Sequence, residues 1–242
     1  MNRREIERRL AALAHTPVNY DPETLDLDNP PSGWHVDDRR QPLPSEPPGP
    51  PLPDGSWEIA RRLIQGYEFA DPSIVRAHYR RDTPLQGRTM LLELRALNLV
   101  SIHVGVRIVD VYDEVRRHAG REARVFGWAY RTLEGHVEMG QMEWQVWKWL
   151  DTGAVQFRVR AISRPAKIPN PIIRVGFWLL REHERGVFLA STETRMCSLT
   201  ELALERGQIG GAVREASPQL TARRLSADDP VHEQLAQTAD AD

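Results

Sequence analysis

The sequence predicts an α+β fold in which a curved antiparallel sheet grips a long C-terminal helix, with a proline-rich N-terminal arm ahead of the sheet. From residue 89 to residue 163, segments of alternating apolar and polar residues follow one another with short turns, which is typical of an antiparallel meander. After them, apolar residues recur at helical spacing for about five turns. A helix with one broad apolar face needs a partner, and the concave face of the sheet is the natural one.

Length and composition bound the class of protein. The 242 residues suit one domain with tails, and 40% hydrophobic residues are enough for a substantial core. The net charge of −2 does not fit a nucleic-acid-binding protein, which normally carries a basic excess. Cys197 is the only cysteine, so an intramolecular disulfide and a thiolate metal cluster are excluded.

Targeting and membrane signals are also absent from the sequence. The start, MNRREIERRL, has charges but no apolar region of the kind found in a secretory signal. No run approaches the roughly 18 apolar residues that a membrane span needs. We therefore expect a soluble cytoplasmic protein, of bacterial origin by its excess of arginine over lysine, without a membrane span.

Three regions follow from the composition along the chain. Residues 1–55 are expected to form a short helix, with Ile6, Leu10 and Leu13 on one stripe, and then a proline-rich arm in which no regular helix or central strand can form. This arm is either a disordered linker or a strap on the domain, anchored by Trp34. Residues 56–196 are expected to form the domain, and residues 197–242 a C-terminal helical piece and a disordered tail.

Within the domain, turn and capping residues delimit the elements. Asp71-Pro72 is a good helix start and predicts a short helix over residues 72–81. Asp151-Thr152-Gly153 predicts a tight hairpin turn. Asn170 and Pro171 predict the start of the long helix, which ends near residue 195. Its stripe includes His183, Val187 and Ala190 and is widened by Phe188. The predicted strands cover residues 89–96, 102–112, 123–131, 138–150 and 154–163.

Two phrases carry a family resemblance. The first is Gly127-Trp128-Ala129-Tyr130-Arg131-Thr132-Leu133, followed by Gly135, His136, Glu138 and Gly140. The second runs from Val155 to Ala161 and into Ser163-Arg164-Pro165-Ala166, with Ile162 where phenylalanine is frequent. Over residues 57–196 the chain resembles the bacterial and plant family called "domain of unknown function nineteen-ninety". The resemblance implies a helix-grip, START-like fold with an apolar ligand cavity, and no particular reaction.

Four polar residues are the candidate ligand contacts: Tyr130, His136, Glu138 and Arg160. His136 and Glu138 are two apart, so they share one side of an extended segment. They could act as a general base with its orienting group, ligate a metal together with His103 and Glu143, or only stabilise a turn. Tyr130 is either a ligand contact or a core tyrosine. Arg160 shares a strand face with Arg158, directed either to solvent or to a ligand carboxylate or phosphate.

Lys148 is one of only two lysines and stands among Trp144, Trp147 and Trp149. A buried lysine can act as a nucleophile or base. We expect instead a surface lysine that pairs with Glu143 or Asp151. Ser163 has no accompanying histidine and aspartate at a recognisable spacing, and no phosphate-binding or dinucleotide-binding loop is present.

Three functions are compatible with these features. The leading hypothesis is a protein that binds a small apolar or amphipathic molecule in a cavity between sheet and helix, without cofactor or metal. The second is an enzyme of hydrolase or cyclase type that uses His136 and Glu138 on the same fold. The third is a protein-interaction module with a filled core, which binds a second copy or another protein through the N-terminal arm.

Overall fold

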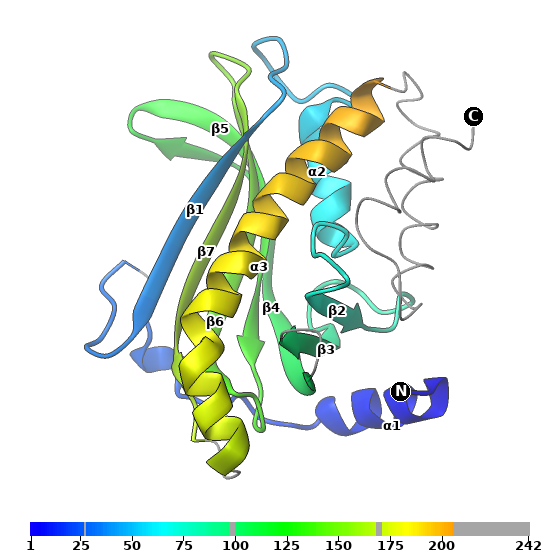
Figure 1. Cartoon of the computed structure of the whole chain (residues 1–242). Coiled ribbons are helices and arrows are strands. Elements are labelled where there is room, and N and C mark those ends of the chain that lie inside the picture. Colours follow the sequence, from blue (N-terminus) through cyan, green and yellow to red (C-terminus); the bar gives the residue numbers. More distant parts are fainter. Residues whose placement is uncertain (27, 97–99, 168–170, 206–242) are drawn as a thin grey trace.

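The protein is built on one seven-stranded antiparallel sheet of order β1-β7-β6-β5-β4-β3-β2. A computed structural model describes residues 1–26, 28–96, 100–167 and 171–205, with backbone only for residues 96, 100 and 171–181. The sheet curves around α3, which crosses it diagonally beside α2 (Figure 1). The elements are α1 (Arg3–Leu13), a 3-10 turn (Pro22–Thr24), β1 (His35–Leu43), α2 (Ser56–Gln65), β2 (Val75–His78), β3 (Thr89–Ala96), β4 (Val100–His118), β5 (Arg121–Thr132), β6 (Glu138–Trp149), β7 (Val155–Pro165) and α3 (Pro171–Glu205).

The predicted meander and the helix-grip arrangement are confirmed. Alternate residues of the central strands point to the side of the sheet on which α2 and α3 pack, which we call the helix-facing side. Trp128, Trp144 and Phe157 lie there and are buried in one cluster with Leu189 and Met196 of α3. The opposite, outer side carries α1, whose Leu13 packs against Gly105. None of the described helices is long and apolar enough to cross a membrane.

The first strand comes from the proline-rich segment. β1 pairs with β7 over nine residues, from His35 opposite Ser163 to Leu43 opposite Val155. Pro42 is tolerated because β1 is an edge strand, where a missing backbone donor leaves no ladder bond unmade. The ring of Trp34 meets Tyr20 edge-on and lies under the guanidinium of Arg164.

The helix predicted over residues 72–81 is wrong. Asp71 does cap one turn, since its side chain accepts hydrogen bonds from the backbone and hydroxyl of Ser73. The chain then extends as β2, with Val75 opposite Leu94 of β3. An Asp-Pro pair can begin either a helix or an isolated turn before a strand. Here the β-branched residues that follow pair with the sheet, and this pairing selects the strand.

The long C-terminal helix is confirmed, but its predicted apolar stripe is only partly correct: Phe188 packs against Trp144, whereas three other members do not face the core. Val187 is 40% exposed and His183 and Ala190 are also exposed, whereas Leu189 and Met196 are buried. α3 runs without a break to Glu205, past the end predicted near residue 195. The predicted cap Asn170 and the tail from residue 206 lie outside the described residues.

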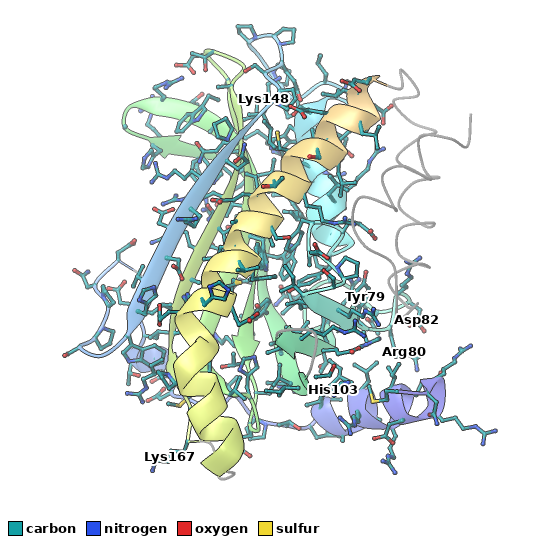
Figure 2. The ribbon with its side chains drawn as sticks, viewed as in Figure 1. Tyr79, Arg80, Asp82, His103, Lys148 and Lys167 are labelled. Atoms are coloured by element: carbon teal, nitrogen blue, oxygen red, sulfur yellow. The ribbon has the colours of Figure 1, made fainter. Side chains whose placement is uncertain are left out.

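Lys148 is not a surface residue, and neither Glu143 nor Asp151 is its partner. Its side chain is fully buried, and Nζ donates to Glu46 Oε2 at 2.6 Å and to the Pro50 carbonyl at 2.9 Å. Glu46 also accepts the backbone N–H of Trp57, in the first turn of α2. Lys148 shares the helix-facing side with Trp144, at the end of the sheet remote from His103 and α1 (Figure 2). Alternation predicts that side, but not a carboxylate 102 residues earlier.

Candidate functional site

Polar side chains from four elements meet where α3 crosses the edge of the sheet. Glu138 of β6, Ser163 of β7 and Asp37 of β1 occupy neighbouring strands on the helix-facing side. Arg185 of α3 reaches all three, as described next. We call these four residues the Arg185 cluster.

Arg185 ties the helix to the sheet. Its Nε donates to Asp37 Oδ2 at 2.6 Å, Nη2 also contacts that oxygen, and Nη1 donates to Ser163 Oγ at 2.7 Å. Nη1 lies 3.5 Å from Glu138 Oε1. Only about a tenth of the Arg185 side chain is exposed, so these charge-assisted bonds form in a partly dehydrated setting, where they are strong.

Tyr130 lies in the apolar interior next to this cluster. It is buried, and its hydroxyl donates to the thioether sulfur of Met142 at 3.3 Å, a weak acceptor. Burial raises the pKa of the Tyr130 hydroxyl far above its usual value, and the charge of Glu138 acts in the same direction. A hydrogen bond with Tyr67 and the charge of Arg185 oppose this pKa shift. Tyr130 is therefore a neutral hydrogen-bonding group.

His136 is held by the turn that precedes β6. Its Nδ1 accepts the backbone N–H of Glu138 at 2.9 Å, so in the neutral ring the proton is on Nε2. Burial lowers the pKa of His136 to about 4, only partly offset by the Glu138 charge. At neutral pH His136 is consequently an uncharged N–H donor, and its one lone pair is engaged by the backbone.

Arg160 lies apart from the other three predicted residues. It alternates with the buried Val159 and Ala161, so it points to the outer side of the sheet. There its guanidinium pairs with Asp28 Oδ1 at 2.6 Å. The structure thus brings Tyr130, His136 and Glu138 to one end of the sheet and places Arg160 on its opposite face.

The two additional metal ligands considered from the sequence do not join His136 and Glu138. His103 lies on the outer side near α1 (Figure 2), and Glu143 accepts the Tyr112 hydroxyl at 2.7 Å on that same side. Within the described parts of the chain, no three histidine, cysteine, aspartate or glutamate side chains are grouped so as to hold a metal ion.

Sequence reasoning missed Arg185 and Asp37. Arg185 precedes the buried Leu189 by four residues, so it stands on the core face of α3, where an arginine signals a special contact. The predicted stripe ran through His183 and Val187, so this signal was overlooked. Asp37 lies in a segment where no strand was predicted, so nothing in the sequence directed it toward α3.

Most of the glycine-rich motif has a structural role. At Gly127, any Cβ would lie 2.3 Å from the hydroxyl of Tyr112, which packs across it. At Gly140, whose φ is +154°, a Cβ would lie 2.0 Å from the Ile162 carbonyl oxygen of β7. The Thr132 hydroxyl accepts the Gly140 N–H. These contacts bring β5, β6 and β7 close together beneath Tyr130.

The comparison with protein families matches the family described as "Domain of unknown function (DUF1990)" over residues 19–185, more than half of the chain. The chain belongs to this family. The resemblance noted in the sequence is thereby confirmed, and the matched span includes β1, Tyr130, His136, Glu138 and Arg185. The comparison with curated proteins gives no match.

Solved structures with a similar arrangement share little sequence with this DUF1990 protein. A norcoclaurine synthase point mutant from Thalictrum flavum has 10% identity and a TM-score of 0.45, covering 72% of this chain and 97% of its own. A hypothetical protein from Helicobacter pylori has 9% identity and a TM-score of 0.39, covering 76% and 95%. Human STARD10 has 7% identity and a TM-score of 0.33, covering 85% and 83%. At this distance they carry no information about the function of this chain.

Proposed function

We propose that this protein binds a small apolar or amphipathic molecule beneath α3, between the helix-facing side of the sheet and the helix. The observation that carries the proposal is the position of Tyr130. Its buried hydroxyl has a weak sulfur acceptor and lies between an aromatic interior and the Arg185 cluster. A ligand with an apolar body and a polar end would meet matching surroundings on both sides of this residue.

The polar end of the site offers both signs of charge. Arg185 supplies donors, and Glu138 supplies a carboxylate whose contacts include Ser163 Oγ at 3.4 Å and Arg185 Nη1 at 3.5 Å. A ligand hydroxyl could donate to Glu138 and accept from Tyr130. Each such hydrogen bond typically contributes about 0.5–1.5 kcal/mol to the free energy of binding.

The enzyme hypothesis has less support. A general base needs a free lone pair and a pKa near the working pH. The lone pair of His136 Nδ1 already accepts the backbone N–H of Glu138, and a pKa of about 4 makes His136 a poor base at neutral pH. The interaction-module hypothesis is favoured by the dense aromatic packing of the interior, and it predicts that no small molecule binds there.

Native mass spectrometry and tryptophan-fluorescence titration test the proposal. The full chain is titrated with decanoate, p-cresol and toluene, which sample an amphiphile, a phenol and an apolar ring. We expect at least one probe to bind the wild-type protein. Tyr130→Phe and Glu138→Gln should each weaken the affinity for a polar probe about tenfold, equivalent to about 1.4 kcal/mol. Tyr112→Phe, on the outer side of the sheet, is the matched control and should bind as wild type does.

Two results would contradict the proposal. One is the absence of any bound probe and of any co-purifying small molecule in wild type. The other is a loss of affinity in Tyr112→Phe as large as that in Tyr130→Phe, which would reflect general destabilisation and not ligand contact.

A further inference from the structure

Tyr67 occupies a backbone conformation that suits glycine. It follows α2 with φ of +59°, in the left-handed region. The residue before it, Gly66, has φ of −85° and an ordinary right-handed conformation. The Glu68 N–H closes the helix end on the Leu63 carbonyl at 2.8 Å, a capping turn whose left-handed position glycine usually fills. The turn therefore places its left-handed conformation on Tyr67, although the adjacent Gly66 would adopt it at lower cost.

This arrangement costs free energy that the surroundings must supply. A left-handed conformation costs an L-residue roughly 1–2 kcal/mol, and a bulky residue is an outlier there. The Tyr67 ring is only 2% exposed and lies among aromatic rings, with centroid distances of 4.7 Å to Phe69, 6.1 Å to Trp128 and 6.2 Å to Trp144. The packing of the buried Tyr67 ring thus offsets the cost of its left-handed backbone conformation.

One buried donor of the same interior, the indole N–H of Trp144, has no acceptor among the described residues. The indole N–H groups of Trp57 and Trp128 donate to backbone carbonyls at 3.2 and 3.1 Å. Trp144 is fully buried, and its indole N–H has no acceptor among the described residues. The nearby Tyr130 hydroxyl donates to the sulfur of Met142. A buried donor without an acceptor costs about 1–3 kcal/mol, so an oxygen acceptor placed beside the Trp144 indole N–H would be favourable.

We infer that Tyr67 is an internal occupant of the ligand site, and that the natural ligand is an aromatic ring that carries an oxygen acceptor, as a phenol or an aryl carbonyl does. The inference rests on the proposed function and specifies its ligand class. The ring that leaves is a phenol, so the space it vacates fits a ring of that size. Walls of Phe69, Trp128 and Trp144 favour offset or edge-on aromatic packing. The acceptor oxygen would satisfy Trp144.

Gly66 supplies the hinge. If the positive φ passes from Tyr67 to Gly66, glycine bears it at little cost and Tyr67 regains a relaxed backbone as its ring leaves. In the present conformation the Gly66 carbonyl accepts the Tyr79 hydroxyl at 2.7 Å. A Cβ on Gly66 would lie 2.9 Å from Cγ of the buried Glu68, so alanine requires a shift of that side chain in the present conformation and also opposes the alternative one, in which φ of this residue is positive.

The decisive comparison uses p-cresol, toluene and decanoate with the full wild-type chain, followed by tryptophan fluorescence and native mass spectrometry. We expect p-cresol to bind at least tenfold more tightly than toluene, because only p-cresol offers an oxygen to the interior donors. Hydrogen–deuterium exchange at residues 66–69 should accelerate when p-cresol binds, since Tyr67 leaves its packed position.

Three variants separate an internal occupant from a structural core residue. Tyr67→Gly accepts φ of +59° and removes the competitor, so p-cresol should bind at least tenfold more tightly than to wild type. Tyr67→Phe keeps the packed ring but loses the hydrogen bond with Tyr130, and should bind p-cresol about threefold more tightly. Gly66→Ala should weaken p-cresol binding about fivefold. Gly186→Ala, whose Cβ would meet open space, is the control and should leave affinity unchanged.

The outcomes distinguish this inference from the proposed function. If decanoate binds wild type and p-cresol does not, the proposed function holds and the aromatic ligand class is overturned. If p-cresol binds Tyr67→Gly but not wild type, the variant has only an engineered cavity and the inference is overturned. Equal affinities in wild type, Tyr67→Phe and Gly66→Ala would also overturn it, and this pair of conservative variants decides the matter if Tyr67→Gly does not fold. If no probe binds wild type, the proposed function falls as well.

Discussion

Individual residues of this protein have roles that depend on which side of the sheet they face. Tyr130 and Lys148 both lie on the helix-facing side, one beside the Arg185 cluster and one bonded to Glu46. Arg160 and Glu143 lie on the outer side and serve in polar contacts there. Because the side-chain period of a strand is two, a shift of one position separates a candidate ligand contact from a surface ion pair.

The buried pair of Lys148 and Glu46 makes a sharp stability prediction. Lys148→Met leaves the Glu46 carboxylate buried without its cation, and we expect the free energy of unfolding to fall by about 3–5 kcal/mol. Lys167, the other lysine, is exposed, so Lys167→Met should change it by less than about 0.5 kcal/mol. Urea unfolding followed by circular dichroism measures both values. Equal stability of the two variants would show that the pair contributes nothing.

His136 predicts a pH dependence of stability. Its folded-state pKa of about 4 lies below the value of about 6.5 in an unfolded chain, so the unfolded chain binds more protons between these values. Its contribution is present above pH 6.5 and is lost as the pH falls toward 4. His136→Asn keeps an acceptor for the Glu138 N–H but does not titrate there, and should reduce the slope of stability against pH between 6.5 and 4.

The control for this measurement is the exposed His15, since His15→Asn should leave the slope unchanged. Burial also lowers the pKa values of His78 and His103, so part of the slope should persist in His136→Asn. Urea unfolding at several pH values measures it. A slope unaffected by His136→Asn would contradict the assignment of a neutral ring in the folded protein.

At the scale of elements, α1 and α3 are each attached to the sheet by a specific contact. Arg107 of β4 donates to the carbonyls of Leu13, Ala14 and Thr16, at the C-terminal end of α1, where a cation is favourable. Asn19 then donates to the Glu138 carbonyl. α3 is attached through Arg185 to Asp37. The turn that carries His136 and Glu138 is thus braced by the chain that follows α1.

α1 packs against Gly105 on the outer side of the sheet through Leu13, and replacement of Gly105 should weaken this packing. In Gly105→Ala the new Cβ would lie 2.3 Å from a methyl group of Leu13, so we expect a loss of about 1–3 kcal/mol. Leu13→Ala makes room, and the double variant should be more stable than the sum of the single effects predicts. Hydrogen–deuterium exchange over residues 3–13 and urea unfolding measure this coupling, and strict additivity would contradict the contact.

At the scale of the whole molecule, the fold depends on pairing between strands that are far apart in the sequence. β1 pairs with β7, and Asp38 of β1 binds Arg158 of β7, 120 residues later. α2 and α3 together cover the aromatic interior on the helix-facing side of the sheet. The matched family span begins at residue 19 and so includes β1. β1 is therefore an edge strand of the domain's sheet, and it contributes Asp37 to the Arg185 cluster.

We predict that a chain beginning at residue 56 does not reach the native state. It lacks β1, which exposes the edge of β7, and it lacks Glu46, which leaves Lys148 buried and unpaired. A chain beginning at residue 15 loses only α1 and should unfold cooperatively at a lower urea concentration. Circular dichroism and light scattering distinguish the two. Cooperative unfolding of the shorter chain at the wild-type midpoint would disprove a required role for β1.

The sequence by itself determined the local elements, because their periodicity is written in consecutive residues. Alternation identified the strands from β3 to β7, helical spacing identified α3, and the motif from Gly127 to Gly140 identified the family. The tertiary structure decided which faces meet. The partner of Lys148, the phase of α3, the pairing of Arg185 with Asp37 and the strained ring of Tyr67 all depend on contacts between distant residues, and such contacts leave no periodic mark in the sequence.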